Sequence, residues 1–263
     1  MALQLHVGET VFSYGHFMFP TPVNGIVDTQ GFLKAAEGIN YFIDLFCGGS
    51  KSVAVGHPFN VVSALSSMPK SVALGGPLTQ LALGHVRTVH KDVISHVALI
   101  NLKRNLELVS SAYNNNPKRY ATINEMVENE LEAGEDAVID ALLWTKRCLH
   151  FGQLTMEYLV ADYKRGDFDG DVLPHLKRAY KNALVKYHNI LTTNSANAAM
   201  YLSAPGKREA MLKMCFNVRG HEAALIRDMD LAAESMKRTI RAIDQIYRTN
   251  GVNLETTERC IIL

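Results

Sequence analysis

The sequence has no excess of charge of one sign. Its 263 residues include 27 basic and 26 acidic side chains, which gives a formal net charge of +1. Nucleic-acid-binding domains usually carry a basic excess or a basic stripe, so no nucleic-acid partner is expected. The sequence also lacks an apolar run of about 18 residues, which argues against a transmembrane helix. Its N-terminus shows no basic stretch ahead of an apolar one, so we expect no secretory signal.

Cysteines and catalytic motifs are also scarce. The four cysteines show no Cys-x-x-Cys spacing, which predicts neither a zinc site nor a disulfide framework and favours a reducing, cytoplasmic compartment. The acidic stretch GDFDGD at 166–171 resembles a calcium loop only loosely, because Arg178 stands where such a loop ends in Glu. Without GxSxG, HExxH or Walker A spacing, an enzyme is the least favoured class, and we expect neither metal nor cofactor.

Helical periodicity, in contrast, is abundant. The composition is 48% hydrophobic, enough for a sizeable core. Apolar residues recur every three or four positions, and alternating β-branched patterns are nearly absent, so we predict an all-α fold. Residues 1–30 lack this periodicity and are predicted to form an extended or loosely packed arm. The predicted helices cover 31–48, 78–113, 120–131, 135–162, 174–202, 207–217 and 221–248.

The C-terminus carries a modification motif. The chain ends in Cys260-Ile261-Ile262-Leu263, a CaaX box whose final leucine favours geranylgeranylation of Cys260. A single prenyl chain anchors a protein only reversibly. The preceding segment is not polybasic, so stable attachment needs a second membrane contact. We therefore expect a cytoplasmic protein that associates with membranes peripherally.

Two segments together resemble the glycolipid transfer protein family. The first, ALLWTKRCLHFG at 141–152, contains Trp144, and the second, ALVKYHNIL at 183–191, contains His188. The resemblance rests on several motifs in the same order along the chain and covers roughly 31–48 and 85–250. The further matching stretches are FLKAAEGINYFIDLFCG, AYNNNPKRYATI, YLSAP at 201–205 and AIDQIY at 242–247.

This resemblance implies a two-layer α-helical sandwich enclosing an apolar cavity, which binds one sphingolipid and moves it between membranes without catalysis. It implies that Trp144 stacks on the first sugar and that His188 bonds the ceramide amide. An indole suits the apolar face of a sugar, whereas an imidazole can donate to an amide carbonyl. The lipid chains are expected to lie against Ile43, Phe151 and Leu184.

The family also uses an Asp to accept sugar hydroxyls, and its position here has two possible registers. One register gives Asp92, followed one turn later by His96. Counting back without gaps from AYNNNP gives Asn101, followed by Asn105. Neither register supplies the family's Lys. We favour Asp92, because the role needs an anionic acceptor.

Asp140, one turn before Trp144, bears on the headgroup. The resemblance implies that relatives that select phosphate carry a pair of arginines at these two positions, where this sequence has Asp140 and Trp144. A carboxylate there would repel a phosphomonoester, so the sequence favours a sugar or amine-bearing headgroup. The alternatives are transfer of ceramide-1-phosphate or another sphingolipid without a sugar, a lipid sensor or adaptor without transfer activity, and a helical interaction module with a closed pocket.

A local repeat interrupts the family pattern. KSVAVGHP at 51–58 returns as KSVALGGP at 70–77, within an insertion at about 49–80. Two copies are too few for a solenoid, so the insertion is either a surface excursion or a segment that touches the membrane or the pocket mouth. We therefore expect a monomer with a glycolipid-transfer-like domain at 31–250 and a tail at 251–263.

Overall fold

The computed structural model describes residues 10–14, 17–47, 102–215 and 219–256. These residues contain no β-strand, and three isolated bridges join loops. The all-α prediction is therefore confirmed. None of the helices in these ranges is long and apolar enough to cross a membrane. Residues 102–115 are helical, and the named elements are α1 (Val11–Tyr14), α2 (Thr29–Cys47), α5 (Ile123–Ala133), α6 (Ala137–Lys164), α7 (Leu173–Ala183), η1 (Val185–Tyr187), α8 (Ile190–Ser203), α9 (Lys207–Met214) and α10 (Glu222–Thr249).

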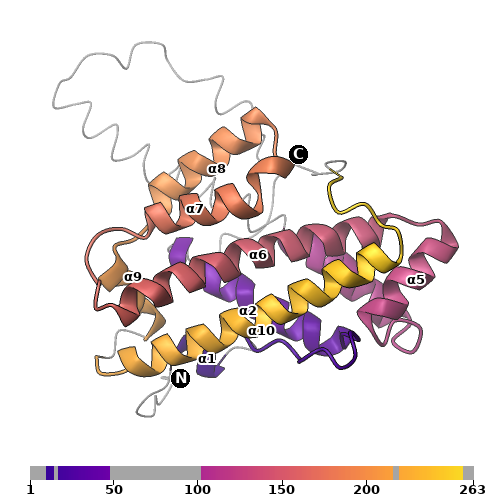
Figure 1. Ribbon diagram of the computed structural model, residues 1–263, viewed down its shortest axis with the longest axis horizontal. Helices are drawn as coiled ribbons and strands as arrows, with labels where there is room; N and C mark the ends of the chain where they lie inside the picture. Colours follow the sequence, from indigo (N-terminus) through magenta and orange to yellow (C-terminus); the bar gives the residue numbers. More distant parts are fainter. Residues whose placement is uncertain (1–9, 15–16, 48–101, 216–218, 257–263) are drawn as a thin grey trace, which may run out of the picture.

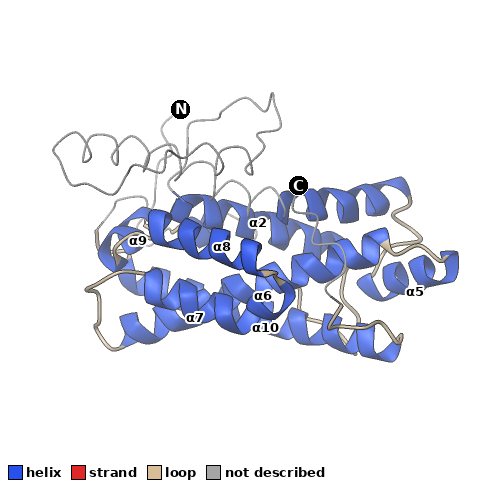
Figure 2. Ribbon diagram, turned by 90° about the horizontal axis from the view of Figure 1, so that it is seen from above, coloured by secondary structure: helices blue, strands red, loops and turns tan. Residues whose placement is uncertain are grey.

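Helix α6 is central to this arrangement. It lies alongside the equally long α10, with α7 and α8 above it in Figure 1. Viewed from above, α2 lies on one side of α6 and α10 on the other (Figure 2). A helix surrounded in this way is buried around most of its circumference. Its buried residues accordingly include the polar Thr145, Lys146 and Arg147 as well as Leu142 and Leu149.

Capping residues set the limits of α5. Thr122 accepts a hydrogen bond from the backbone N–H of Glu125 (3.1 Å), and the Glu125 carboxylate accepts one from the Thr122 N–H (3.0 Å). This reciprocal pair fixes the start of the helix three residues later than the apolar pattern predicts. Gly134, with φ of +70°, ends the helix in the left-handed conformation that glycine adopts without strain.

The prediction of one helix over 174–202 is wrong. Helix α7 ends at Ala183, the short 3-10 helix η1 follows, and α8 begins only at Ile190. The Asn189 side chain caps α8 by accepting the backbone N–H of Thr192 (2.9 Å), an interaction that competes with helix continuation through this residue. The break leaves His188 in an extended conformation between the two helices.

The described part of the predicted loose arm is instead packed into the core. Phe17 and Phe19 are buried there, and the backbone N–H of Phe19 donates to Ser235 Oγ on α10 (3.2 Å). A tight turn at Asn24 and Gly25, both with positive φ, then leads into α2. The insertion at 49–80 lies outside the described residues.

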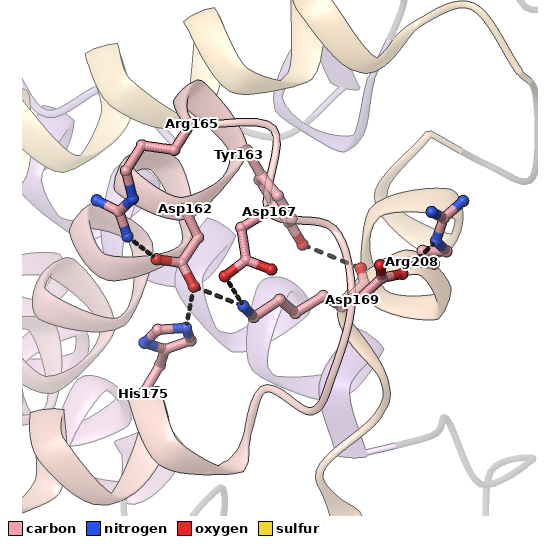
Figure 3. A network of polar contacts seen from close by, with 8 residues as sticks. Asp162, Tyr163, Arg165, Asp167, Asp169, His175 and Arg208 are labelled. Carbon is pink, nitrogen blue, oxygen red and sulfur yellow. Dashed lines mark hydrogen bonds and ion pairs between the residues drawn. The ribbon is translucent and has the colours of Figure 1, made fainter.

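A polar cluster around Asp162 ties the end of α6 to α7 and α9 (Figure 3). The Asp162 carboxylate accepts hydrogen bonds from Lys207 Nζ (2.6 Å) and His175 Nε2 (2.7 Å), and it also pairs with Arg165. Burial alone would raise the pKa of Asp162, but the hydrogen bonds from Lys207 and His175 outweigh it and lower the pKa. We call these four residues the Asp162 cluster.

The acidic loop after α6 is neutralised by the start of α9. Asp167 accepts from Lys207 (2.9 Å), and Asp169 accepts from Arg208 (3.0 Å). Two of the three carboxylates of GDFDGD, those of Asp167 and Asp169, thus have basic side chains as partners. These ion pairs connect the loop that follows α6 to the start of α9.

Candidate functional site

The segment between α7 and α8, which contains His188, faces the N-terminal half of α6. The rings of Trp144 and His188 are stacked, with centroids 5.6 Å apart and an angle of 17° between their planes. Tyr180, near the end of α7, places its hydroxyl oxygen 2.7 Å from Nδ1 of His188. The structure therefore brings together the tryptophan and the histidine that the two sequence motifs single out.

His188 is held in its neutral form. Burial, assisted by the nearby charge of Arg147, lowers the pKa of His188 to about 4. A neutral imidazole has one donor and one acceptor nitrogen. Because Nδ1 contacts the hydroxyl of Tyr180, Nε2 is the nitrogen that a ligand would engage.

Arg147 connects this stack to the end of the chain. Its guanidinium carbon lies 3.5 Å from the ring centroid of Tyr187 and 4.6 Å from that of Trp144, within the range of cation–π contacts. Its Nη2 donates to the backbone carbonyls of Leu254 (3.0 Å) and Thr256 (2.7 Å). Arg147 lies within the ALLWTKRCLHFG motif, and the sequence predicted no contact for it.

The Arg147 side chain is buried without full hydrogen bonding. The residue is 1% exposed, and its Nε and Nη1 find no hydrogen-bond acceptor in the described part of the chain. Burial lowers the pKa of Arg147, although the neighbouring Tyr187 acts in the opposite direction. Unpaired buried donors are costly, so these two nitrogens favour an acceptor-rich group next to the stack.

Residues 252–256 cover the same corner of the molecule. Lys186 Nζ lies 2.8 Å from both carboxylate oxygens of Glu255, and this contact is the main reason that the pKa of Glu255 is lowered. Val252 and Leu254 pack against the apolar core. Trp144 itself is only 6% exposed, so the ring expected to receive a sugar is covered in this structure.

Some of the other predicted site residues lie in described helices, and the rest fall outside the described part of the chain. Asp140 is half-buried one turn before Trp144 on α6, and Asn105 is half-buried in the helix at 102–115. Phe151 packs against the apolar core and Leu184 is part of it. Asp92, His96, Asn101 and Cys260 lie outside the described residues, as does the side chain of Ile43.

Comparisons of sequence identify related proteins. Residues 90–216 match the family model of glycolipid transfer protein. The pleckstrin homology domain-containing family A member 8 of Canis lupus familiaris is 24% identical over 162 residues, covering 58% of this chain and 30% of that protein. A glycolipid transfer protein of Danio rerio is 29% identical over 102 residues, covering 37% of this chain and 49% of that protein. The chain thus spans half or less of the length of both relatives.

Comparisons of structure extend the likeness over nearly the whole chain. A fungal glycolipid transfer protein, HET-C2, superposes with a TM-score of 0.62 at 15% identity, covering 90% of this chain and 94% of that one. The mouse ceramide-1-phosphate transfer protein also gives a TM-score of 0.62, at 14% identity, with coverage of 92% and 95%. At these identities the likeness shows a shared fold, and it confirms the predicted α-helical architecture.

Proposed function

We propose that this chain is a member of the glycolipid transfer protein family, whose model matches residues 90–216, and that it binds one sphingolipid and carries it between membranes. The observation that carries this proposal is the contact of Trp144, His188 and Tyr180 at the break after α7. An aromatic face beside a neutral imidazole is suited to a sugar joined to an amide. No bond is made or broken in this process, so the protein acts as a carrier.

The amide end of the lipid is assigned to His188. With its pKa near 4, the imidazole is neutral at physiological pH and can hydrogen-bond a ceramide amide without a charge to desolvate. Tyr180 fixes the ring through Nδ1, which directs Nε2 to the ligand. The lipid chains then extend along Ile43, Phe151 and Leu184.

The sugar end is assigned to Trp144 and the neighbouring acidic side chains. Asp140 lies one helical turn before the indole, and Asp92 or Asn101 is proposed to accept sugar hydroxyls. A carboxylate beside the indole disfavours a phosphomonoester. We therefore propose a glycosphingolipid as the ligand, in preference to ceramide-1-phosphate.

A vesicle transfer assay tests the function and the headgroup together. Fluorescent glucosylceramide and ceramide-1-phosphate are offered separately in phosphatidylcholine vesicles to the wild type and to Trp144→Ala and Trp144→Phe. Loss of the aromatic face in Trp144→Ala should slow glucosylceramide transfer about tenfold or more, whereas Trp144→Phe should retain part of it. Preferred transfer of ceramide-1-phosphate by the wild type would contradict the headgroup assignment, and transfer of neither lipid would contradict the function.

The membrane partner is proposed to be reached in part through Cys260. A geranylgeranyl group there would hold the protein reversibly at a cytoplasmic membrane surface. In a eukaryotic cell, Cys260→Ser should move the protein from the membrane fraction to the soluble fraction. An unchanged distribution would remove the anchor from the proposal.

A further inference from the structure

We infer that residues 252–256 form a latch that closes the headgroup site and gives way when a ligand enters. This inference rests on the proposed function, because it concerns access to the same site. We call these five residues the C-terminal latch. They reach the site from the end of α10, more than a hundred residues after Arg147 in the sequence.

The first support is the way that Arg147 is shared. One guanidinium contacts Trp144 and Tyr187 through its flat face and two latch carbonyls through Nη2. The latch thus holds the cation in place over the indole. A ligand cannot reach that part of the ring until the guanidinium moves, and moving it breaks both hydrogen bonds to the latch.

The second support is the ion pair that fastens the latch from the other side. Lys186 lies in η1, two residues before His188, and holds both carboxylate oxygens of Glu255 at 2.8 Å. Both members are more than half exposed, so the pair is weak and can open readily. A fastening of this strength suits a segment that must exchange with a ligand.

The third support is the unsatisfied state of Arg147. Its Nε and Nη1 are buried and lack an acceptor among the described residues, so no residue in the described part of the closed site uses these two donors. The latch carbonyls accept only from Nη2. The oxygens of a sugar or other polar headgroup can accept from Nε and Nη1. Ligand entry therefore replaces incomplete hydrogen bonding by more complete bonding, and this difference drives the exchange.

The protein contains a single tryptophan, so Trp144 reports directly on the latch. Glu255→Lys removes the ion pair and places a like charge beside Lys186 and near Arg147. Acrylamide quenching of Trp144 is measured in lipid-free, full-length protein, together with uptake of fluorescent glucosylceramide from phosphatidylcholine vesicles and the thermal unfolding midpoint. We expect quenching and initial uptake rate to rise about two- to fivefold, the range for loss of an exposed ion pair, with the midpoint nearly unchanged.

Two control variants separate the latch from general effects of charge. Lys186→Glu combined with Glu255→Lys restores an ion pair of reversed polarity, and quenching should return towards the wild-type value. Glu128→Lys makes the same charge change at an exposed position on α5 and should alter neither quenching nor uptake.

The outcomes distinguish the latch from the function on which it rests. Unchanged quenching in Glu255→Lys together with normal uptake overturns the latch and leaves the proposed function intact. Slower uptake with a lowered unfolding midpoint also overturns it, because the segment would then be structural support. Increased quenching without sphingolipid uptake by either form overturns the proposed function, and with it the coupling of the latch to a ligand.

Discussion

The two ends of α6 bury charge in opposite ways. At the C-terminal end, Asp162 is surrounded by three basic side chains that satisfy its carboxylate. Near the N-terminal end, Arg147 is buried between aromatic rings, with two backbone carbonyls as acceptors and two nitrogens that find no acceptor among the described residues. A satisfied buried charge fixes a structure, whereas a partly satisfied one favours rearrangement when better partners arrive. The comparison indicates that polar contacts fix the C-terminal end of α6 more firmly than the region around Arg147.

The largest expected effect comes from removing a member of the Asp162 cluster. Lys207→Met leaves the buried Asp162 and the neighbouring Asp167 without their shared lysine. Removing one member of a buried pair typically costs about 3–5 kcal/mol, so we expect a loss of that order in the free energy of unfolding. Chemical denaturation followed by circular dichroism measures it. The exposed pair of Asp169 and Arg208 supplies the control, because Asp169→Asn should cost less than about 1 kcal/mol. Equal losses in the two variants would contradict the stabilising role of the Asp162 cluster.

The pH dependence of the free energy of unfolding should reveal the buried, neutral His188 beside Trp144. His188 has a folded-state pKa of about 4 and an ordinary value of 6.5. Above pH 6.5 it is neutral in both states, and between 6.5 and 4 the unfolded chain takes up a proton that the folded protein resists. The free energy of unfolding should therefore fall as the pH drops through this window, by at most about 3 kcal/mol.

Denaturant titrations of the wild type and of His188→Asn at pH 7, 5.5 and 4.5 test this expectation. The variant should show a shallower fall, because the asparagine does not titrate. The Asp162 cluster contributes at lower pH, since the lowered pKa of Asp162 gives stability that is present above its ordinary value and is lost as the pH falls through the folded-state value. Parallel pH profiles in both proteins would argue against a buried neutral histidine.

The smallest expected effect is at Arg147. Arg147→Met removes a buried cation whose hydrogen bonding is incomplete and replaces it with an apolar chain of similar length. Such replacements are often close to neutral, so the free energy of unfolding should change by about 1 kcal/mol or less. The same denaturation assay measures it beside Lys207→Met. A loss as large as that of Lys207→Met would show that the buried charges at both ends of α6 stabilise the fold equally.

Much of the fold follows from local patterns in the sequence. Helices α2, α5, α6, α9 and α10 occur within a few residues of the predicted ranges, because spacing of three and four fixes which residues share a face. The error at 174–202 has a local cause as well. Asn189 caps α8 with its side chain, and that signal was present in the sequence but was outweighed by the apolar residues on either side.

The candidate site was predicted only in part. Trp144 and His188 were identified from the motifs, and Arg147, three residues after Trp144, shares its helix face by ordinary helical geometry. That spacing was a usable signal for the cation–π contact. Nothing in the spacing indicated that Tyr180 would approach His188, because their contact depends on where α7 ends.

The sequence by itself determined the helical class, the main helices and the residues of the two motifs, since these depend on neighbours within a few positions. Tertiary structure decided that Trp144 is covered, that Arg147 is buried and that Glu255 closes over Lys186. These contacts join residues separated by up to 109 positions in the chain. Such separations are set by how helices pack and where the chain returns after α10, and helical periodicity contains no information about either.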